Sequence, residues 1–339
     1  MPDAPTVLIA DKFDAVGVEG LESLGCVVHE MPDLEPETIP EAAGRHEAEV
    51  LIVRSTRVPA GVFERCGGLK LVIRAGAGHD NIDSQAAGAR GVPVCNCPGM
   101  NAVAVSELAI GHMINLDRRI CAQTADLKNG RWNKKEYAKA SGLKGRRVLV
   151  VGLGSIGTEF VKRVQSFGMD ISAQSRSLRA DTARALGIHL IEYTREALYD
   201  AIAESDVVTV HVALTPDTEN LCDGRFFDAM RPGTMFLNTS RGEIVDEDAL
   251  MEAVRGKGIR VGLDVYNGQP SGKEARWKPG LADLPGVSLT HHIGASTDQS
   301  QEAVAKEAVR IVGSWMNDGV APHIVNKDAL AGAGGAAGV

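Results

Sequence analysis

The feature that most constrains the fold is a repeated alternation of short apolar runs, rich in valine, isoleucine and leucine, with segments of helical pattern. Early in the chain the runs recur roughly every 20–25 residues, too far apart for β-hairpins and well suited to parallel strands joined by crossover helices. Unbroken apolar runs also indicate strands that are buried on both faces of a sheet. The expected strands lie within residues 6–13, 26–31, 48–55, 69–76, 92–99, 146–154, 169–175, 188–193, 205–214, 233–240, 259–266 and 287–292.

These runs form two groups, which predict two domains. The first group ends near Pro98, and a proline-free helical pattern from about Asn101 to Asn129 follows it. We therefore predict an α/β chain with two doubly wound parallel-sheet domains. The helical pattern after His292 indicates a helix that returns to the first domain, which would make that domain discontinuous. The expected boundaries are 1–100 plus 293–326 for the first domain, 101–292 for a dinucleotide-binding domain, and 327–339 for a disordered tail without packing partners.

Composition excludes several classes of function. The 339 residues are 44% hydrophobic and 24% charged, with a formal net charge of −8. This is ordinary for a soluble globular protein and argues against nucleic acid or an anionic membrane as a partner. No apolar stretch approaches the ~20 residues of a membrane span, and no signal peptide is evident, so we expect a cytoplasmic protein. The six cysteines lack a metal-binding spacing, and we expect buried, reduced thiols and no metal site.

Glycine is over-represented, with 38 residues, and three of them form the pattern Gly152-x-Gly154-x-x-Gly157 between an expected strand and an expected helix. In this context the first glycine makes a tight turn, the second admits a pyrophosphate, and the third lets helix and strand pack closely. Ser155 and Ile156 open the helix, where free N–H groups can bind the phosphates. The pattern predicts a dinucleotide site.

The next strand suggests which dinucleotide is bound. An NAD enzyme usually carries an acidic residue at its tip to bind the ribose 2′-hydroxyl. Here the strand ends in Ser175-Arg176. A small hydroxyl and a guanidinium suit a 2′-phosphate, so we expect NADP(H) to be accepted and slightly favoured. The alternative is an NAD enzyme in which Arg176 only stacks on the adenine.

Three polar side chains follow the ends of later strands: Arg241, Gln269 and His292. Ligands of parallel sheets bind beyond the carboxyl ends of the strands, so these groups can converge. Hydride transfer to a 2-keto acid needs a cation for the carboxylate and a proton donor for the developing alkoxide. Arg241 and His292 have these chemistries.

Together with the glycine pattern, these segments resemble the D-isomer-specific 2-hydroxyacid dehydrogenase family over nearly the whole chain. Several long motifs in one order are more specific than any one of them. The matching motifs are RAGAGHDNID (74–83), NCPGMNAVAVSELAIGHM (96–113), VGLGSIG (151–157), HVALTPDT (211–218), NTSRGEIVDEDAL (238–250) and HHIGAST (291–297).

The resemblance implies a flavodoxin-like substrate domain built from both chain ends, a Rossmann cofactor domain, an active-site cleft between them, and a homodimer or tetramer. It implies that Arg241 orients the substrate carboxylate and that His292 is the acid/base. His211, Thr239 and Asp264 match positions on the cofactor side.

One position departs from the family pattern. Gln269 stands where the family usually has glutamate, which would hydrogen-bond His292 and favour its charged form. Glutamine can orient the ring through its carbonyl but adds no negative charge. Formate dehydrogenases, a branch of the family that needs no proton transfer, also carry glutamine here, although their other signatures are not evident.

Candidate substrate residues lie in the first domain. Arg54 and Arg74 end expected strands, and Gly76 and Ala77 belong to the loop after the second of these. Both arginines match substrate positions of the D-3-phosphoglycerate dehydrogenase subgroup, which the chain resembles most. Lys134 falls where that subgroup has a basic residue near the substrate phosphate. A substrate with carboxylate and phosphate needs several cations, which a protein of net negative charge must place locally.

The resulting expectation is an NAD(P)-dependent enzyme that oxidises 3-phosphoglycerate to 3-phosphohydroxypyruvate in serine biosynthesis. An NADPH-dependent glyoxylate or hydroxypyruvate reductase is the alternative within the family. A dinucleotide-sensing corepressor on the same fold is the alternative of another class. No C-terminal regulatory domain fits after Asn326, so feedback through such a domain is not expected.

Overall fold

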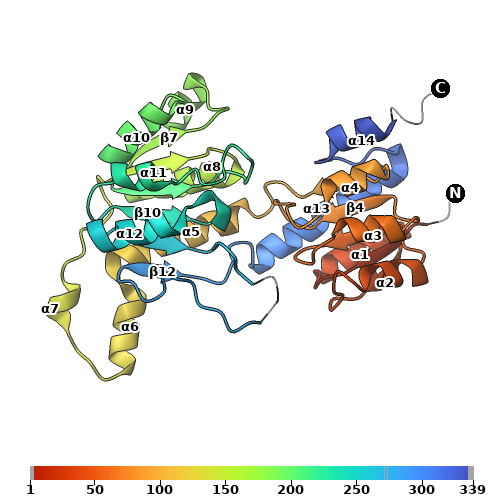
Figure 1. Cartoon of the computed structure of the whole chain (residues 1–339), viewed down its shortest axis with the longest axis horizontal. Helices are drawn as coiled ribbons and strands as arrows, with labels where there is room; N and C mark the ends of the chain where they lie inside the picture. Colours follow the sequence, from red (N-terminus) through yellow and green to blue (C-terminus); the bar gives the residue numbers. More distant parts are fainter. Residues whose placement is uncertain (1–3, 271, 273, 335–339) are drawn as a thin grey trace. The chain divides into compact units, whose positions relative to one another are not determined.

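A computed structural model describes residues 4–270, 272 and 274–334 of the chain (Figure 1). It divides into two compact units. Unit 1 contains the described residues up to Asn101 and those from Ala295 onward, and unit 2 is Ala102–Gly294. The first boundary follows residue 101, where we expected it after residue 100, and the second follows residue 294, where we expected it after residue 292. Among the described residues, no helix is long and apolar enough to cross a membrane.

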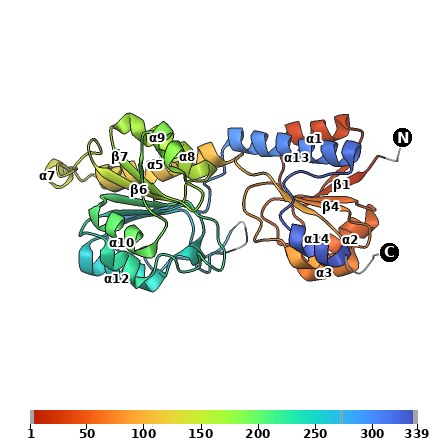
Figure 2. The same cartoon turned by 90° about the horizontal axis from the view of Figure 1, so that it is seen from above.

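Unit 1 is built on a five-stranded parallel sheet of order β2-β1-β3-β4-β5. One face is covered by helices α1 and α13, whose Leu21 and Ile311 pack on Val7 and Ile9, and the other by α2, α3, α4 and α14 (Figure 2). Both faces are therefore buried, as the unbroken apolar runs predict. The strands are β1 Thr6–Ile9, β2 Val27–Glu30, β3 Val50–Val53, β4 Leu71–Arg74 and β5 Val94–Asn96; the helices are α1 Ala15–Ser23, α2 Ile39–Arg45, α3 Ala60–Arg65, α4 Ser84–Ala89, α13 Asp298–Asp318 and α14 Lys327–Gly334.

Helix α14 corrects the expected disordered tail. Residues 327–334 are helical and pack against α4. Gly88 of α4 permits this close approach, because a Cβ there would lie 2.3 Å from the Cβ of Ala329 in α14. The buried Asn326 anchors the start of α14 by accepting from Val94 N–H at 2.9 Å and donating to Val92 O at 3.0 Å. Residues 335–339 of the expected tail lie outside the described residues.

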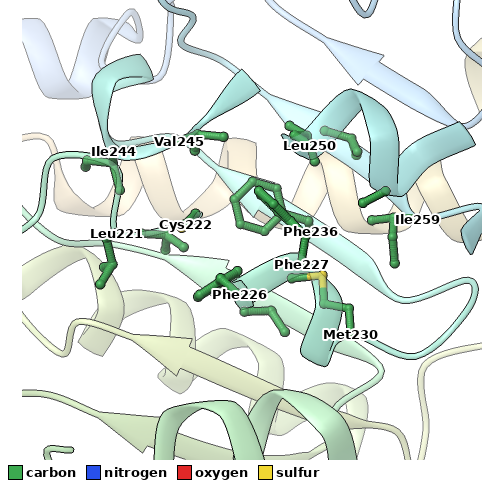
Figure 3. Close-up of a cluster of buried hydrophobic side chains, with 14 of the residues drawn as sticks. Leu221, Cys222, Phe226, Phe227, Met230, Phe236, Ile244, Val245, Leu250 and Ile259 are labelled. Atoms are coloured by element: carbon green, nitrogen blue, oxygen red, sulfur yellow. The ribbon is translucent and has the colours of Figure 1, made fainter. Parts of the chain in front are cut away.

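Unit 2 is built on a seven-stranded parallel sheet of order β12-β11-β10-β9-β6-β7-β8. Helices α5 and α8 cover one face, while α10, α11 and α12 cover the other around Phe226, Phe227 and Phe236, whose rings meet edge to face (Figure 3). The strands are β6 Arg147–Val151, β7 Asp170–Gln174, β8 His189–Leu190, β9 Val207–Val210, β10 Met235–Asn238, β11 Arg260–Leu263 and β12 Val287–Leu289; the helices are α5 Ala102–Arg118, α6 Ile120–Lys128, α7 Lys134–Tyr137, α8 Ser155–Val164, α9 Ala180–Leu186, α10 Arg195–Glu204, α11 Gly224–Ala229 and α12 Glu247–Lys257, with 3-10 turns at Gln165–Phe167 and Gly242–Ile244.

The single helix expected from Asn101 to Asn129 is two helices, α5 and α6. Arg119 between them has φ of 53°, a left-handed conformation that interrupts the helix. Two contacts stabilise the break. Asn115 Oδ1 accepts from Cys121 N–H at 2.9 Å and so caps α6, while the Arg119 guanidinium lies over the Tyr137 ring at 4.7 Å. Cys121 is exposed, unlike the other five cysteines, which are buried as expected.

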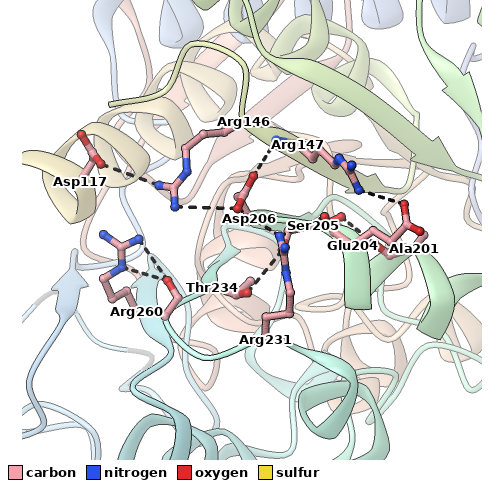
Figure 4. Close-up of polar contacts among 11 residues, drawn as sticks. Asp117, Arg146, Arg147, Ala201, Glu204, Ser205, Asp206, Arg231, Thr234 and Arg260 are labelled. Atoms are coloured by element: carbon pink, nitrogen blue, oxygen red, sulfur yellow. Dashed lines mark hydrogen bonds and ion pairs between the residues drawn. The ribbon is translucent and has the colours of Figure 1, made fainter. Parts of the chain in front are cut away.

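A polar cluster fixes the C-terminal end of α5 at the N-terminal edge of the sheet (Figure 4). Arg146, which precedes β6, lies 3.8 Å from buried Asp117 and 3.9 Å from Asp206. Arg260, the first residue of β11, donates to Leu116 O at 3.2 Å. Helices α6 and α7, which follow α5 in unit 2, consequently lie at the edge of the sheet opposite to the carboxyl ends of its strands (Figure 1).

Candidate active site

The glycine pattern forms the turn between β6 and α8. Gly152 has φ of 95°, and a Cβ there would lie 2.6 Å from the carbonyl oxygen of His211, which follows the neighbouring strand β9. A Cβ on Gly157 would lie 2.3 Å from Gly152 O. These two positions therefore accept only glycine, because the backbones of β6, β9 and α8 meet there. Within the described part of the chain, a Cβ on Gly154 would meet no atom within 4 Å. Gly154 thus opens onto the space in front of α8.

The first residues of α8, Ser155 and Ile156, present their backbone N–H groups at a helix N-terminus whose N-cap, Gly154, has no side chain to bind them. The sheet order reverses beside this turn, between β6 and β9, which is where doubly wound sheets bind ligands. Thr239, just after β10, adds a buried hydroxyl with no hydrogen-bond partner among the described residues. An open glycine, free helix N–H groups and an orphan hydroxyl fit the phosphates and ribose of a dinucleotide.

His211 contacts the glycine turn through its backbone carbonyl, which lies next to Gly152. Its side chain is buried, hydrogen-bonds Thr209 Oγ1 through Nε2 at 2.9 Å and packs on the Phe160 ring. Burial lowers the pKa of His211 to about 4, so the imidazole is neutral.

Ser175 and Arg176 directly follow β7, the next strand along this edge. Ser175 is half-buried and Arg176 is exposed. Arg176 forms no ion pair within the described ranges, which leaves its charge available to an external anion.

Arg241 lies in the loop after β10. Its carbonyl accepts from Asn238 Nδ2 at 2.8 Å, and its Nη1 donates to Ser240 O at 2.7 Å. The next residue, Gly242, lies against the loop after β11, because a Cβ there would be 2.1 Å from the carbonyl carbon of Tyr266. This close backbone packing brings the loop that carries Arg241 against the loop that carries Gln269.

Gln269 and His292 are in direct contact. Gln269 Oε1 accepts from Tyr266 N–H at 3.1 Å, so its Nε2 amide faces His292 Nδ1 at hydrogen-bonding distance. The ring is therefore oriented by the amide nitrogen, where the sequence led us to expect the carbonyl. Because an amide N–H only donates, Nδ1 must accept and the ring proton lies on Nε2. If the His292 ring were charged, Nδ1 would also carry a proton, and this N–H would face the N–H donor of the Gln269 amide.

This contact predicts the effect of Gln269→Glu. A carboxylate would keep the Tyr266 bond, accept from Nδ1–H and favour the charged ring. We expect the alkaline limb of kcat/KM for keto-acid reduction to move to higher pH by about one unit. Glu274, exposed on the same segment, offers a control as Glu274→Gln. Steady-state profiles from pH 5 to 10 test this, and an unmoved limb in Gln269→Glu would show that the two side chains are not coupled.

Asp264, directly after β11, holds the segment that carries His292. Its carboxylate accepts from Ile293 N–H at 2.9 Å and Gly294 N–H at 2.7 Å, and from the Thr290 hydroxyl at 2.6 Å. His292 itself has φ of 54°, which is strained for a residue with a side chain. The Asp264 carboxylate thus bonds the segment that carries His292, a role that the family resemblance alone did not suggest.

In unit 1, Arg54 follows β3 at the carboxyl edge of its sheet. Its guanidinium donates to Gln301 Oε1 at 3.1 Å and lies 3.3 Å from Ser296 Oγ. These partners are neutral, so the positive charge of Arg54 is oriented without being compensated. Asp11, which sequence reasoning missed, shapes this loop by accepting from the N–H groups of Arg54, Ser55 and Thr56 through one oxygen. Its position after β1 was the only available signal.

Arg74, Gly76 and Ala77 lie at the end of the neighbouring strand β4. The Arg74 guanidinium folds over Gly76, whose φ is 155°, and a Cβ there would lie 1.6 Å from Arg74 Nη1. Ala77 O accepts from Asn96 Nδ2 at 2.6 Å, which joins this loop to β5. The two candidate arginines of unit 1, Arg54 and Arg74, thus lie at the carboxyl ends of adjacent strands of one sheet.

Lys134 does not join the other candidate residues of unit 2. It begins α7, at the edge opposite to the carboxyl ends of the strands (Figure 1). The other candidates of unit 2 follow β7, β6, β9, β10, β11 and β12, which lie in this order along the sheet. Sequence reasoning also missed Asn238 and Tyr266, although both lie at strand ends where such groups are expected.

Comparison with known proteins identifies the family. The sequence model for the D-isomer specific 2-hydroxyacid dehydrogenase, NAD binding domain, matches residues 110–294. A hydroxypyruvate reductase from Thermotoga maritima is 40% identical over 265 residues, which cover 78% of this chain and 83% of that protein. The chain belongs to this family. The 2-hydroxyacid dehydrogenase family consists of NAD(P)-dependent oxidoreductases, and the matched NAD binding domain includes the turn at Gly152–Gly157.

Two further similarities are informative within the 2-hydroxyacid dehydrogenase family. D-3-phosphoglycerate dehydrogenase 2, chloroplastic, from Arabidopsis thaliana is 36% identical over 330 residues and 96% of this chain, which spans about half, 51%, of that relative. The structure of an NADPH-dependent glyoxylate/hydroxypyruvate reductase from Sinorhizobium meliloti, in complex with NADP and malonate, superposes with a TM-score of 0.77 at 26% identity, covering 95% of this chain and 96% of that one.

Proposed function

We propose that this protein transfers a hydride between a nicotinamide cofactor and a D-2-hydroxy acid, with 3-phosphoglycerate and 3-phosphohydroxypyruvate as its substrate pair. The observation that carries the proposal is the convergence of Arg241, Gln269 and His292 on the carboxyl ends of three adjacent strands, β10, β11 and β12. They share this edge with the glycine turn at Gly152.

The chemistry divides among these groups. The nicotinamide, when bound, accepts or supplies the hydride. Arg241 supplies the cation that binds the substrate carboxylate and polarises the carbonyl. His292 presents Nε2–H to the substrate oxygen, because Gln269 occupies Nδ1. To act as the acid in reduction, the exposed ring must first take a proton from solvent at Nδ1, and the Gln269 amide must turn so that its carbonyl accepts Nδ1–H while Tyr266 N–H loses its partner. Nε2 then gives its proton to the substrate oxygen and the ring returns to the neutral form, protonated on Nδ1. The lost Tyr266 bond opposes formation of the charged ring.

Arg54 and Arg74 support a phosphorylated substrate. Both are cations at the carboxyl edge of the unit 1 sheet, and Arg54 has neutral partners that leave its charge available to an anion. In a protein of net charge −8, two such cations on adjacent strands indicate a specific anionic ligand.

An NADPH-linked hydroxypyruvate or glyoxylate reductase is a second candidate. It is favoured by the exposed Arg176 beside Ser175, which suits the 2′-phosphate of NADP(H). The Thermotoga hydroxypyruvate reductase and the NADP-complexed Sinorhizobium reductase also support it.

The two candidates are separated by cofactor absorbance with 3-phosphoglycerate, hydroxypyruvate, glyoxylate and formate in parallel. We expect the highest kcat/KM with the phosphorylated substrate. Arg54→Ala should lower kcat/KM for that substrate by about 10- to 100-fold and for glyoxylate by much less, because a charge-assisted bond to phosphate is lost. Arg57→Ala, an exposed arginine of the same loop, is the matched control.

Each outcome of this panel assigns a function. Higher kcat/KM with hydroxypyruvate than with 3-phosphohydroxypyruvate would favour the reductase. Turnover of formate alone would indicate a reaction without proton transfer. Cofactor binding without turnover of any substrate would contradict the dehydrogenase proposal and favour a dinucleotide-sensing binding protein.

A homodimer is part of the proposal. Helix α6 buries no side chain within its own chain, and Ile120, Leu127 and Trp132 are exposed on it or just after it. An apolar set of this kind on an extended element is typical of an interface between protein chains. Lys134 follows the same segment and would then serve a second copy of the chain.

A further inference from the structure

His112 is a buried polar residue of α5, a helix in which the sequence analysis named no candidate site residue. Its side chain is 3% exposed and lies against the sheet at β11, where a Cβ on Gly262 would be 2.8 Å from the His112 Cβ. Its Nδ1 is 2.8 Å from Ser288 Oγ and its Nε2 is 3.1 Å from Thr290 Oγ1. Glycine at 262 thus makes room for His112, which hydrogen-bonds Ser288 and Thr290, the residues on either side of the last residue of β12.

The partners fix the direction of every hydrogen bond in this cluster. Both side-chain oxygens of Asp264 accept from backbone N–H groups, and Thr290 donates its single hydroxyl proton to Oδ1 at 2.6 Å. Thr290 Oγ1 must then accept from His112 Nε2–H. Nδ1 accepts from the Ser288 hydroxyl, which in turn accepts from Asn115 Nδ2 at 2.9 Å. Burial lowers the pKa of His112, in agreement with a neutral ring protonated on Nε2.

This chain of bonds ends on the strained backbone of His292. Asp264 receives the Thr290 proton and also holds Ile293 N–H and Gly294 N–H. Those two bonds keep the segment in the conformation that places His292 at φ of 54°. Left-handed backbone at a residue with a side chain persists only when its surroundings impose it.

We propose that His112 is a positioning residue for His292, acting through the directed chain His112 Nε2–H to Thr290 to Asp264. Because His112 Nε2–H donates to Thr290 Oγ1, the Thr290 hydroxyl proton is directed to Asp264. This bond holds the Asp264 carboxylate in the position from which it accepts the N–H groups of Ile293 and Gly294, next to His292. This role rests on the dehydrogenase function proposed above.

The test compares Thr290→Val, which is nearly isosteric but lacks the hydroxyl, with Thr290→Ser, which keeps it. We expect kcat to fall about three- to tenfold in Thr290→Val, the effect of one buried hydrogen bond, with the KM for the cofactor unchanged. Thr290→Ser should restore kcat. Thr234→Val removes the hydroxyl of a buried threonine at the N-terminal edge of the same sheet and should leave kcat as in the wild type.

A double-mutant cycle makes the test specific to His112. If both residues act through one chain, His112→Leu should lower kcat to the same extent, and His112→Leu/Thr290→Val should lose no more than either single variant. Unchanged kcat in Thr290→Val, or losses that multiply in the double variant, would overturn the proposal. A wild-type protein that turns over none of the substrates would refute the dehydrogenase function itself.

Nitrogen-15 chemical shifts of the histidine rings give a readout that does not depend on activity. They should show His112 protonated on Nε2 in the wild type. Protonation on Nδ1 would contradict the direction of the chain.

Discussion

His292→Ala should lower kcat by about 10²- to 10⁴-fold, the range for loss of a positioned acid/base. The structure gives the reason: Gln269 fixes Nδ1, so the ring presents Nε2 alone to the substrate oxygen, and Asp264 fixes the backbone on which the ring stands. Alanine at 292 removes this group without disturbing the glycine turn at Gly152. We therefore expect cofactor affinity, measured by quenching of protein fluorescence, to stay within about twofold.

The neighbouring His291 supplies a matched control. It is also exposed and stands next in the chain, but it has no assigned role in the proposed chemistry. His291→Ala should retain wild-type kcat. Equal losses in the two variants would show that the effect comes from disturbing the loop and not from removing the acid/base.

Ser175→Asp combined with Arg176→Ala should reverse the cofactor preference. The change removes a guanidinium that can bind the 2′-phosphate and introduces a carboxylate that repels the phosphate and accepts from a ribose hydroxyl. We expect the ratio of kcat/KM for NADPH to that for NADH to fall on the order of 100-fold.

Arg184→Ala is the control for the loss of an exposed arginine, because Arg184 lies on α9 of the same unit, exposed and 3.5 Å from Asp181. A wild-type preference for NADH, with a ratio that the double substitution leaves unchanged, would show that Arg176 does not contact the 2′-phosphate.

The strands could be predicted because their signal is local. A run such as Val207–Val210 is buried at every position, and only a strand covered on both faces needs four such residues in a row. The candidate residues at strand ends followed from the same pattern, since parallel strands deliver their carboxyl ends to one edge. The break at Arg119 and the helix from Lys327 were missed because Asn115 and Gly88 act through contacts that no hydropathy pattern contains.

The finer geometry of the site depends on groups far apart in the chain. His112 and Thr290 are separated by 178 positions, and their bond exists only because Gly262 lets α5 approach the sheet. The orientation of the Gln269 amide depends on the Tyr266 N–H, a backbone group that is the same in every sequence. The sequence therefore shows that residue 269 is a glutamine, expected beside His292, but it does not show whether the amide nitrogen or the carbonyl oxygen faces the ring.

The most direct test of the central claim is the stereochemistry of the product. Hydroxypyruvate and 3-phosphohydroxypyruvate are each reduced with the preferred nicotinamide cofactor, and the hydroxy acids are resolved by chiral chromatography after phosphatase treatment. We expect one mole of cofactor oxidised per mole of product and D-glycerate alone in both cases. Formation of L-glycerate, or no cofactor oxidation with either keto acid, would contradict it.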